Sequence, residues 1–332
     1  MINAAIAGLG RWGRTIVDAA SGHDRLRFVA AIEPARARAQ DYCAQHKLRL
    51  VDDLATVLAD PAIDAVFLAT PHSLHYAQVV ACATARKPVF CEKPLALTYT
   101  DAKRMFDACR DTGVPLAVGH NRRFWPSMNA LREIVASGVL GTILHGEGHN
   151  SNEHSKAVLS GWRLSPDESP GGGMTGAGLH ALHALISVIG PVRNVYAQLL
   201  SRQARPPQLD TVSVVLDFAC GASGTLATIR MTPFYWRVHI FGTDGSAEVL
   251  DETTLVLRMS GAQPERRQYQ PINVMRAEID AFADTLEADR PFPVTEEEVL
   301  TTLAAFNAIV RSTERGTPIP CAEAYAKAAP DK

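Results

Sequence analysis

Residues 3–13, which read NAAIAGLGRWG, decide the fold of the N-terminal half. The apolar start predicts a short buried strand, and the glycines form a GxGxxG pattern that opens a helix expected over residues 13–20. In this setting the glycines permit a tight turn and a close backbone approach, while the helix N-terminus favours a pyrophosphate. The alternative is a glycine-rich turn that holds no ligand. The dinucleotide-binding residues expected here are Gly8, Gly10, Arg11, Trp12 and Gly13.

Short apolar segments alternate with helices as far as residue 120. The expected strands are residues 27–32, 65–69, 89–91 and 115–118, and the expected helices are residues 35–46, 53–59, 74–84 and 100–111. This alternation predicts a parallel sheet that helices cover on both faces, with right-handed crossovers. Residues 1–120 are therefore predicted to form a doubly wound Rossmann domain.

The pattern changes after residue 121, where sequential strands with short turns dominate. The expected strands are residues 143–149, 195–200, 211–218, 224–230, 238–242, 247–250 and 255–259, with helices over 126–137, 275–288 and 296–315. Such strands favour a large, mostly antiparallel sheet. Residues 121–332 are predicted to be an α/β domain that binds substrate. No later helix clearly covers the outer sheet face, so we expect that face to pack against another subunit in a homodimer or homotetramer.

Composition excludes several classes of protein. The chain has 332 residues, a length that favours two domains, and its formal net charge of −2 provides no basic field for nucleic acid. No stretch predicts a membrane span or a signal peptide. The six cysteines form no CxxC pair, which favours reduced thiols in a cytoplasmic protein over a zinc site.

Glu33 ends the second expected strand, 20 residues after Gly13. An acidic side chain at this place can accept hydrogen bonds from the adenosine ribose hydroxyls, and it repels a 2′-phosphate. Glu33 therefore favours NAD over NADP. Arg36 and Arg38 keep NADP open, because a guanidinium pairs well with a phosphate; a solvated helix face is the other interpretation of both arginines.

Lys93 follows the strand expected over residues 89–91 and so lies at the carboxyl edge of the parallel sheet. Ligands of such folds bind at that edge. An ammonium group there can donate a hydrogen bond to a substrate oxygen and stabilise developing negative charge. Taken alone, Lys93 could equally be a surface lysine in a loop.

Five motifs come in one order along the chain. They are GLGRWG at 8–13, an acidic residue at 33, TPHSLH at 70–75, EKP at 92–94, and GGG at 171–173 leading to GLH at 178–180. This order resembles the Gfo/Idh/MocA family of oxidoreductases, the relatives of glucose–fructose oxidoreductase and inositol dehydrogenase, over essentially the whole chain. The EKP and GGG…GLH elements carry most of the specificity.

The resemblance implies an NAD(P)-dependent dehydrogenase that acts on CH–OH groups of a sugar, cyclitol, sugar acid or related diol. It implies that Lys93 and His180 are the catalytic pair, and that members commonly pair through the open face of the C-terminal sheet. The further cofactor-binding residues that it implies are Thr70, Pro71, His75, Glu92, Lys93, Asn121 and Arg163. The substrate-binding residues expected from it are Arg123, Trp162, His180 and His183.

One position departs from the family pattern. Family dehydrogenases often carry an aspartate four residues before the histidine, where this chain has Gly176, and an acidic residue three after it, where this chain has His183. An enzyme that uses tightly held NAD transiently, for net elimination, hydrolysis or epimerisation, therefore stays open. A cofactor-sensing binding protein is a third possibility, which the retention of Lys93 and His180 argues against.

Helix spacing separates the two histidines. Leu179, Leu182 and Ile186 form one apolar stripe; His180 lies well off the stripe, and His183 lies at its edge. We therefore expect His183 to tend towards the core and His180 to be available for acid–base chemistry, for which an imidazole pKa near 6.5 is suited.

His145, Glu147 and His149 alternate along one expected strand and so share a face. Metal binding by this trio is possible, but no further ligand is evident. We therefore predict no metal and expect His149 to belong to a polar wall of the substrate cleft or to a hydrogen-bonded sheet face. Looser candidates for substrate contact are His154, Lys156 and Tyr235, and arginines that could pair with an anionic substrate are Arg122, Arg123, Arg163 and Arg237.

Overall fold

The computed structural model describes residues 1–151, 161–201, 210–230 and 232–326. His154 and Lys156 lie outside these residues. The chain divides into two compact units. The first comprises Met1–Ala96, Asp101–Asn121 and Asn273–Thr295, and the second comprises Leu97–Thr100, Arg122–Ile272 and Glu296–Lys332. The predicted boundary between residues 120 and 121 does not account for one segment, because Asn273–Thr295 belongs to the first unit.

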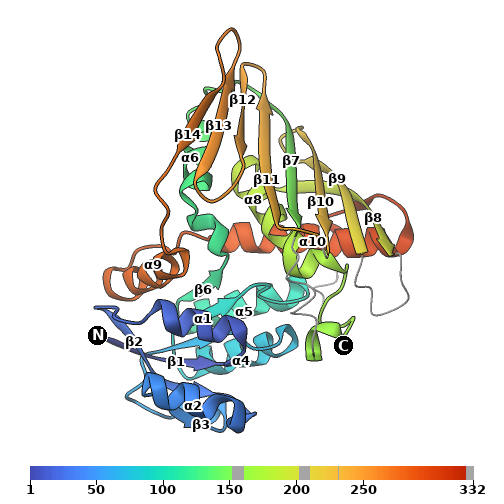
Figure 1. Cartoon of the computed structure of the whole chain (residues 1–332). Helices are drawn as coiled ribbons and strands as arrows, with labels where there is room; N and C mark the ends of the chain where they lie inside the picture. The colour runs from blue at the N-terminus through green and yellow to red at the C-terminus, as the bar shows by residue number, and fades with distance from the viewer. Residues whose placement is uncertain (152–160, 202–209, 231, 327–332) are drawn as a thin grey trace. The chain divides into compact units, whose positions relative to one another are not determined.

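The first unit is built on a six-stranded parallel sheet in the order β3-β2-β1-β4-β5-β6 (Figure 1). Its strands are β1 (Ile2–Ala7), β2 (Leu26–Ile32), β3 (Arg49–Val51), β4 (Ala65–Leu68), β5 (Val89–Glu92) and β6 (Leu116–Gly119). Its helices are α1 (Arg11–Ala19), α2 (Arg36–His46), α3 (Leu54–Leu58), α4 (His72–Thr84), α5 (Tyr99–Thr112) and α9 (Val274–Ala288). The strand order is that of a Rossmann fold, which confirms the predicted fold class. The edge strand β3 was not predicted.

Apolar packing holds α9 against the parallel sheet. Phe282 is fully buried, and its ring meets Phe67 of β4 and Phe90 of β5 edge-on, with centroids 5.3 and 5.8 Å apart. At the end of the helix, Asp284 accepts a hydrogen bond of 2.5 Å from Arg25. A fully buried Phe stabilises its site by a few kcal/mol, so these contacts explain why a segment so distant in sequence belongs to this unit.

The second unit contains a nine-stranded sheet in the order β14-β13-β12-β11-β7-β10-β9-β8-β15 (Figure 1). Its strands are β7 (Ile143–Ser151), β8 (Val192–Ser201), β9 (Asp210–Phe218), β10 (Ser223–Ile229), β11 (Tyr235–Gly242), β12 (Gly245–Val249), β13 (Thr254–Met259), β14 (Glu265–Gln268) and β15 (Ile319–Pro320). Neighbouring strands are antiparallel except β7 and β10, which pair in parallel. The predicted large, mostly antiparallel sheet is confirmed. The prediction did not include the parallel pair or the short strands β14 and β15.

Within the part of the chain that the structure describes, helices cover one face of this sheet and leave the other open. Its helices are η1 (Asn121–Phe124, shared with the first unit), α6 (Pro126–Ala136), η2 (Gly161–Leu164), the π-helix η3 (Met174–Gly178), α8 (Leu179–Ile189), α10 (Glu296–Arg315) and α11 (Glu323–Ala326). Figure 1 shows α8 and α10 behind the strands. A Cβ on Gly146 or Gly148 would lie only 2.4 Å from Ile189 Cδ1 or 2.9 Å from Leu185 Cδ1, so these glycines let α8 approach β7.

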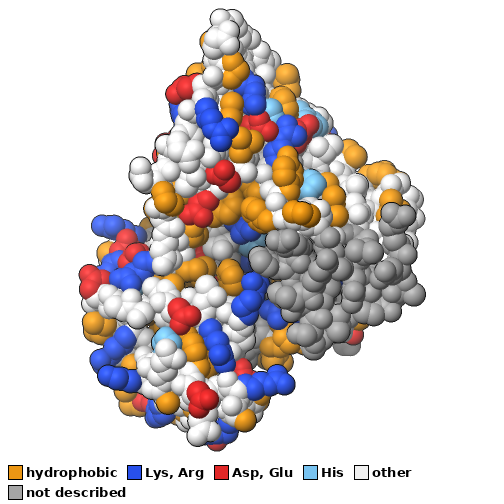
Figure 2. Space-filling view, in the orientation of Figure 1, with side chains coloured by type: hydrophobic (Ala, Val, Ile, Leu, Met, Phe, Trp, Pro, Cys, Tyr) orange, Lys and Arg blue, Asp and Glu red, His pale blue; other side chains and the backbone are white. Residues whose placement is uncertain are grey.

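On the open face, Val215 and Tyr235 are 55% and 50% exposed. Figure 2 shows hydrophobic, histidine and charged side chains mixed across the front of the sheet. Among the described residues, no helix combines the length and apolar character needed to cross a lipid bilayer.

Candidate functional site

Two glycines in the loop after β1 occupy positions where a side chain would clash with the backbone. Gly8 has a φ of +90°, and a Cβ there would lie 2.6 Å from the carbonyl oxygen of Ala69. A Cβ on Gly13 would lie 1.9 Å from the Gly8 carbonyl oxygen, so α1 can pack closely only without a side chain at this position. A Cβ on Gly10 would meet no atom of the residues placed by the structure within 4 Å. The loop thus leaves open backbone at the start of α1, where an anion is favoured.

Glu33 is held in place at the end of β2. Its Oε2 accepts a hydrogen bond of 3.0 Å from the Leu9 N–H, and its Oε1 accepts one of 3.1 Å from the Ala35 N–H. These bonds hold the carboxylate beside the glycine loop, as the motif predicts for a ribose ligand. Arg36 pairs with Asp52, which leaves it less available for a phosphate.

His75 connects two loops at the carboxyl edge of the sheet. Its Nδ1 lies 3.0 Å from the Pro94 carbonyl oxygen and its Nε2 lies 3.1 Å from the Thr70 carbonyl oxygen. The side chain is fully buried and connects the loops that follow β4 and β5, and its place beside the cofactor stays a prediction. Thr70 Oγ1 donates a hydrogen bond of 2.6 Å to Gln78, and Pro71 occupies the N-cap position of α4.

Glu92 and Lys93 form the end of β5. Glu92 is buried and its Oε2 lies 3.3 Å from the Lys93 backbone nitrogen, whereas Lys93 itself is half-buried. Burial raises the pKa of Glu92 to about 7, against the opposing influence of the Trp12 indole and the Lys93 ammonium. Asn121, just beyond β6, is also buried. The first unit thus gathers the glycine loop, Glu33 and the Glu92–Lys93 pair at the carboxyl ends of β1, β2 and β5.

A π-helix leads directly into α8 in the second unit and sets the position of His180. The Asn150 side chain of β7 donates a hydrogen bond of 2.8 Å to the Ala177 carbonyl oxygen, and Thr175 Oγ1 donates one of 2.6 Å to the Pro170 carbonyl oxygen. Short π-helical segments of this kind occur often at functional sites. His180 is half-buried in the first turn of α8 between buried Leu179 and Ala181, which agrees with its predicted place off the apolar stripe.

His183 faces the interior of the second unit. Its Nε2 lies 4.0 Å from Glu298 Oε2, and only 2% of the residue is exposed. Burial, together with the positive charges of Arg123 and Arg132, lowers the pKa of His183 to about 3. His183 is therefore a neutral, buried histidine, as its place at the edge of the apolar stripe predicts, and its contact with substrate stays a prediction. Arg132 and Glu298 belong to this cluster and were not predicted.

The remaining predicted residues of the second unit are Trp162, Arg163, Arg123 and His149. The Arg163 guanidinium stacks over the Trp162 ring at 4.1 Å, and both side chains are half-buried. The Arg123 Nε lies 3.8 Å from Glu298, on the helical side of the unit. His149 is on the open face of the sheet, opposite the face that α8 covers, so the structure does not bring His149 together with His180.

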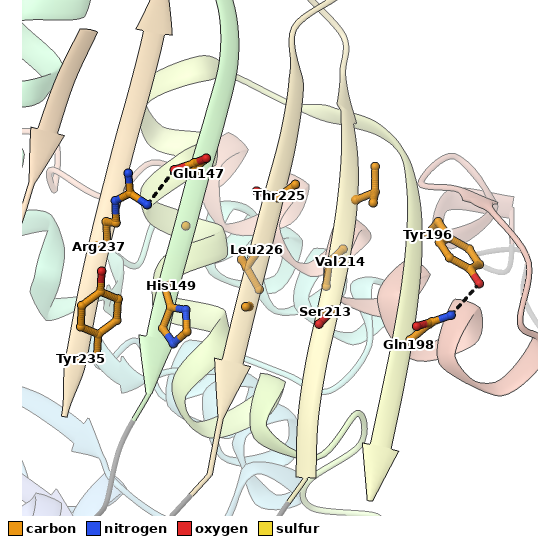
Figure 3. A pocket seen from close by; sticks show the side chains of 13 residues that line it. Glu147, His149, Tyr196, Gln198, Ser213, Val214, Thr225, Leu226, Tyr235 and Arg237 are labelled. Atoms are coloured by element: carbon orange, nitrogen blue, oxygen red, sulfur yellow. Dashed lines mark hydrogen bonds and ion pairs between the residues drawn. The ribbon is translucent and has the colours of Figure 1, made fainter. Parts of the chain in front are cut away.

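A hollow of about 470 Å³ lies on this open face (Figure 3). His149 and Tyr235 lie at one side of it with ring centroids 4.9 Å apart, and Arg237 pairs with Glu147 at 2.9 Å. The hollow belongs to a surface remote from α8 and His180, and its polar groups are largely paired with each other. We therefore do not identify it with the catalytic site.

The trio His145, Glu147 and His149 shares this open face, as the alternation predicts. His145 Nδ1 lies 2.7 Å from Ser223 Oγ, and His149 Nε2 lies 2.5 Å from Ser151 Oγ. Each member thus has its own partner. Among the residues that the structure describes, no group of three histidine, cysteine or acidic side chains is placed to hold a metal ion.

Comparisons with known proteins cover both units. Residues 2–120 match the model of an oxidoreductase family with an NAD-binding Rossmann fold, and residues 128–248 match that of the GFO/IDH/MocA C-terminal domain. The chain is 30% identical over 256 residues to myo-inositol 2-dehydrogenase of Thermotoga maritima, covering 73% of this chain and 75% of that protein. It is 27% identical over 271 residues to 2,7-anhydro-N-acetylneuraminate hydratase of Escherichia coli, covering 79% and 71%. A levoglucosan dehydrogenase solved with NADH and L-sorbose shares the fold, with a TM-score of 0.87, 22% identity and coverage of 96% and 98%.

Proposed function

The chain belongs to the Gfo/Idh/MocA family of oxidoreductases, and from this membership we propose that it oxidises a CH–OH carbon of a sugar, cyclitol, sugar acid or related diol with NAD. The observation that carries the proposal is the position of Lys93, half-buried at the carboxyl end of β5 and adjacent to the buried Glu92. We propose His180, the histidine of the GLH motif, as its partner in the reaction.

The residues of the first unit fit a dinucleotide. Gly10 leaves room for a close approach of the pyrophosphate, and the fixed Glu33 carboxylate can accept hydrogen bonds from ribose hydroxyls. The pairing of Arg36 with Asp52 supports NAD over NADP. Bound NAD would supply the hydride acceptor.

The chain's own residues would move the proton. In this proposal the Lys93 ammonium donates a hydrogen bond to the substrate oxygen and stabilises its developing negative charge. His180, as a neutral imidazole, accepts the hydroxyl proton. General base catalysis of this kind contributes roughly 10²–10⁴-fold to a rate.

The test is reduced-nicotinamide absorbance, with NAD or NADP and a panel of sugars, cyclitols, sugar acids and diols. We expect a signal that prefers NAD and that Lys93→Ala and His180→Ala each reduce by at least about 100-fold, while both variants still bind NADH. Turnover that survives both substitutions would refute the assignment. A reaction with neutral polyols alone would exclude the anionic substrate that the arginines suggest.

A second candidate is the transient use of tightly held NAD for net elimination, hydrolysis or epimerisation. Gly176 favours it, because this exposed position in η3 lacks the aspartate that family dehydrogenases often carry. Similarity to a protein named a hydratase points the same way. Product analysis that finds a converted substrate without accumulated NADH would distinguish this reaction from a dehydrogenase.

We also propose that the open face of the nine-stranded sheet is the contact between subunits of a homodimer or homotetramer. Exposed Val215 and Tyr235 and the hollow beside them give this face an apolar centre with paired charges around it. Val215→Lys should lower the mass measured by light scattering, whereas Val139→Lys, an exposed position outside the sheet, should not. An unchanged mass for Val215→Lys would count against the interface.

A further inference from the structure

α8 packs along β7 in a regular register. Alternate residues of the strand face the helix, and the last three of them are Gly146, Gly148 and Asn150. A Cβ on Gly146 would lie 2.4 Å from Ile189 Cδ1, and one on Gly148 would lie 2.9 Å from Leu185 Cδ1 and 3.6 Å from Ala181 Cβ. Two residues of a strand span about 6.6 Å and four residues of a helix about 6 Å, so each step of two along β7 matches a step of four along α8.

Asn150 continues this register beyond the start of α8. Its Nδ2 donates a hydrogen bond of 2.8 Å to the carbonyl oxygen of Ala177, four residues before Ala181 and within the π-helix η3. In this segment the Leu179 N–H bonds to the Met174 carbonyl oxygen, five residues earlier. Asn150 is only 2% exposed, so water competes little for its bond to the π-helix.

His180 lies between two points at which β7 holds the helix. One residue after it, Ala181 packs on Gly148; three residues before it, Ala177 accepts the bond from Asn150. The end turns of helices open more readily than their centres. The bond from Asn150 therefore holds the turn that carries His180 from its N-terminal side.

The other half of the Asn150 amide makes no such contribution. Its Oδ1 is buried and accepts no hydrogen bond from the described residues. A buried acceptor without a partner costs about 1–3 kcal/mol, and a leucine, which has a similar size, would not carry this cost. Asparagine is thus a poor residue for stability at this position, although it is well suited to donate to Ala177. Departures of this kind from a stable core are expected at functional sites.

We propose that Asn150 is a positioning residue for His180, which it holds in place through the carbonyl group of Ala177. Correct placement matters because a displacement of about 1 Å can slow a reaction about 100-fold. The inference rests on the proposed role of His180 as the proton acceptor, and it concerns the second unit alone.

The first test requires no turnover. Amide hydrogen exchange of the full chain is followed by mass spectrometry in the unaltered protein, in Asn150→Leu and in Ser312→Ala. Ser312 is the matched control, because its buried hydroxyl also donates to a backbone carbonyl, that of Thr317 at 2.7 Å, but accepts from Ala197 of β8, three strands away from β7. In Asn150→Leu, residues 176–181 should exchange roughly fivefold faster, as the loss of one buried hydrogen bond allows, whereas Ser312→Ala should leave them unchanged. Unchanged exchange in Asn150→Leu would overturn the proposal.

The second test asks whether the effect passes through His180. With a substrate from the panel, Asn150→Leu should lower kcat about 10- to 100-fold and change KM far less, while Ser312→Ala should keep kcat. In a His180→Ala background, Asn150→Leu should lower kcat no further, since residues that act as a unit are not additive. A full additional loss in that background would show that Asn150 acts by another route and would refute the proposal.

The two tests fail in distinguishable ways. If His180→Ala leaves turnover unchanged, the proposed role of His180 is wrong, while the exchange measurement still decides whether Asn150 holds the turn. If Asn150→Leu does not fold, Asn150→Ala removes the same donor without adding bulk and takes its place in both tests.

Discussion

Two glycines of the same loop should fail in different ways when each is changed to alanine. A Cβ on Gly13 would lie 1.9 Å from the Gly8 carbonyl oxygen, a backbone atom that cannot rotate aside. α1 would have to move away from β1, and overpacking of this kind costs about 1–3 kcal/mol. For a unit of this size that corresponds to a fall in Tm of roughly 3–10 °C.

Gly10→Ala should leave the fold intact. Gly10 has an ordinary φ of −66°, and its Cβ would meet no atom of the described residues within 4 Å. The free energy of unfolding should therefore change by less than about 0.5 kcal/mol. The added methyl group would instead occupy the space that a pyrophosphate needs, and we expect the Kd for NADH to rise at least about tenfold, equivalent to 1.4 kcal/mol.

Differential scanning calorimetry and titration calorimetry with NADH measure the two effects separately. Gly13→Ala should lower both Tm and affinity, whereas Gly10→Ala should lower affinity alone. The reasoning fails if Gly10→Ala binds NADH as tightly as the unaltered protein, or if Gly13→Ala keeps its Tm.

Three further predictions concern charge, cofactor choice and the long-range packing of α9. The pKa of His183 is lowered to about 3 in the folded protein, so the free energy of unfolding is highest above the unfolded pKa near 6.5 and falls by up to about 1.4 kcal/mol for each pH unit below it. Urea unfolding midpoints measured between pH 7.5 and pH 5 should therefore depend less steeply on pH in His183→Gln than in the unaltered protein. Glu33→Gln removes the carboxylate charge and should reduce the preference for NADH over NADPH, as measured by titration calorimetry, by about tenfold. Phe282→Ala empties a site between Phe67 and Phe90 and should cost about 3–5 kcal/mol in chemical denaturation, while an unchanged midpoint would show that α9 is not anchored there.

The Rossmann half of the molecule could be predicted well because its elements carry strong local signals. The expected strand over residues 65–69 agrees with β4 (Ala65–Leu68), and the expected helix over 74–84 agrees with α4 (His72–Thr84) to within two residues. Runs of apolar residues between helices specify a parallel sheet with little ambiguity. The three-residue edge strand β3 was missed, since so short a segment has no period to detect.

The faces of the nine-stranded sheet were harder to assign. Alternation correctly places His145, Glu147 and His149 together, but alternation alone does not say which face the helices cover. The two glycines that alternate with these residues indicate which face is covered. Gly146 and Gly148 occupy the side that α8 approaches closely, and a glycine within a strand often marks such an approach. The same signal would have placed His149 on the open face and away from His180.

The burial of Glu278 is difficult to predict from local sequence, although the spacing of its neighbours indicates it. A glutamate in an amphipathic helix is ordinarily taken as solvated, and nothing local indicates that α9 packs on a sheet formed some two hundred residues earlier in the chain. Its spacing, however, is that of a core residue: Glu278 lies three residues after Met275 and four before Phe282, beside Ile279, and all four are buried. An ionisable residue inside an apolar stripe costs stability unless it holds a proton or a partner. Burial raises the pKa of Glu278 well above the ordinary glutamate value, so the residue occupies this apolar stripe as a neutral acid.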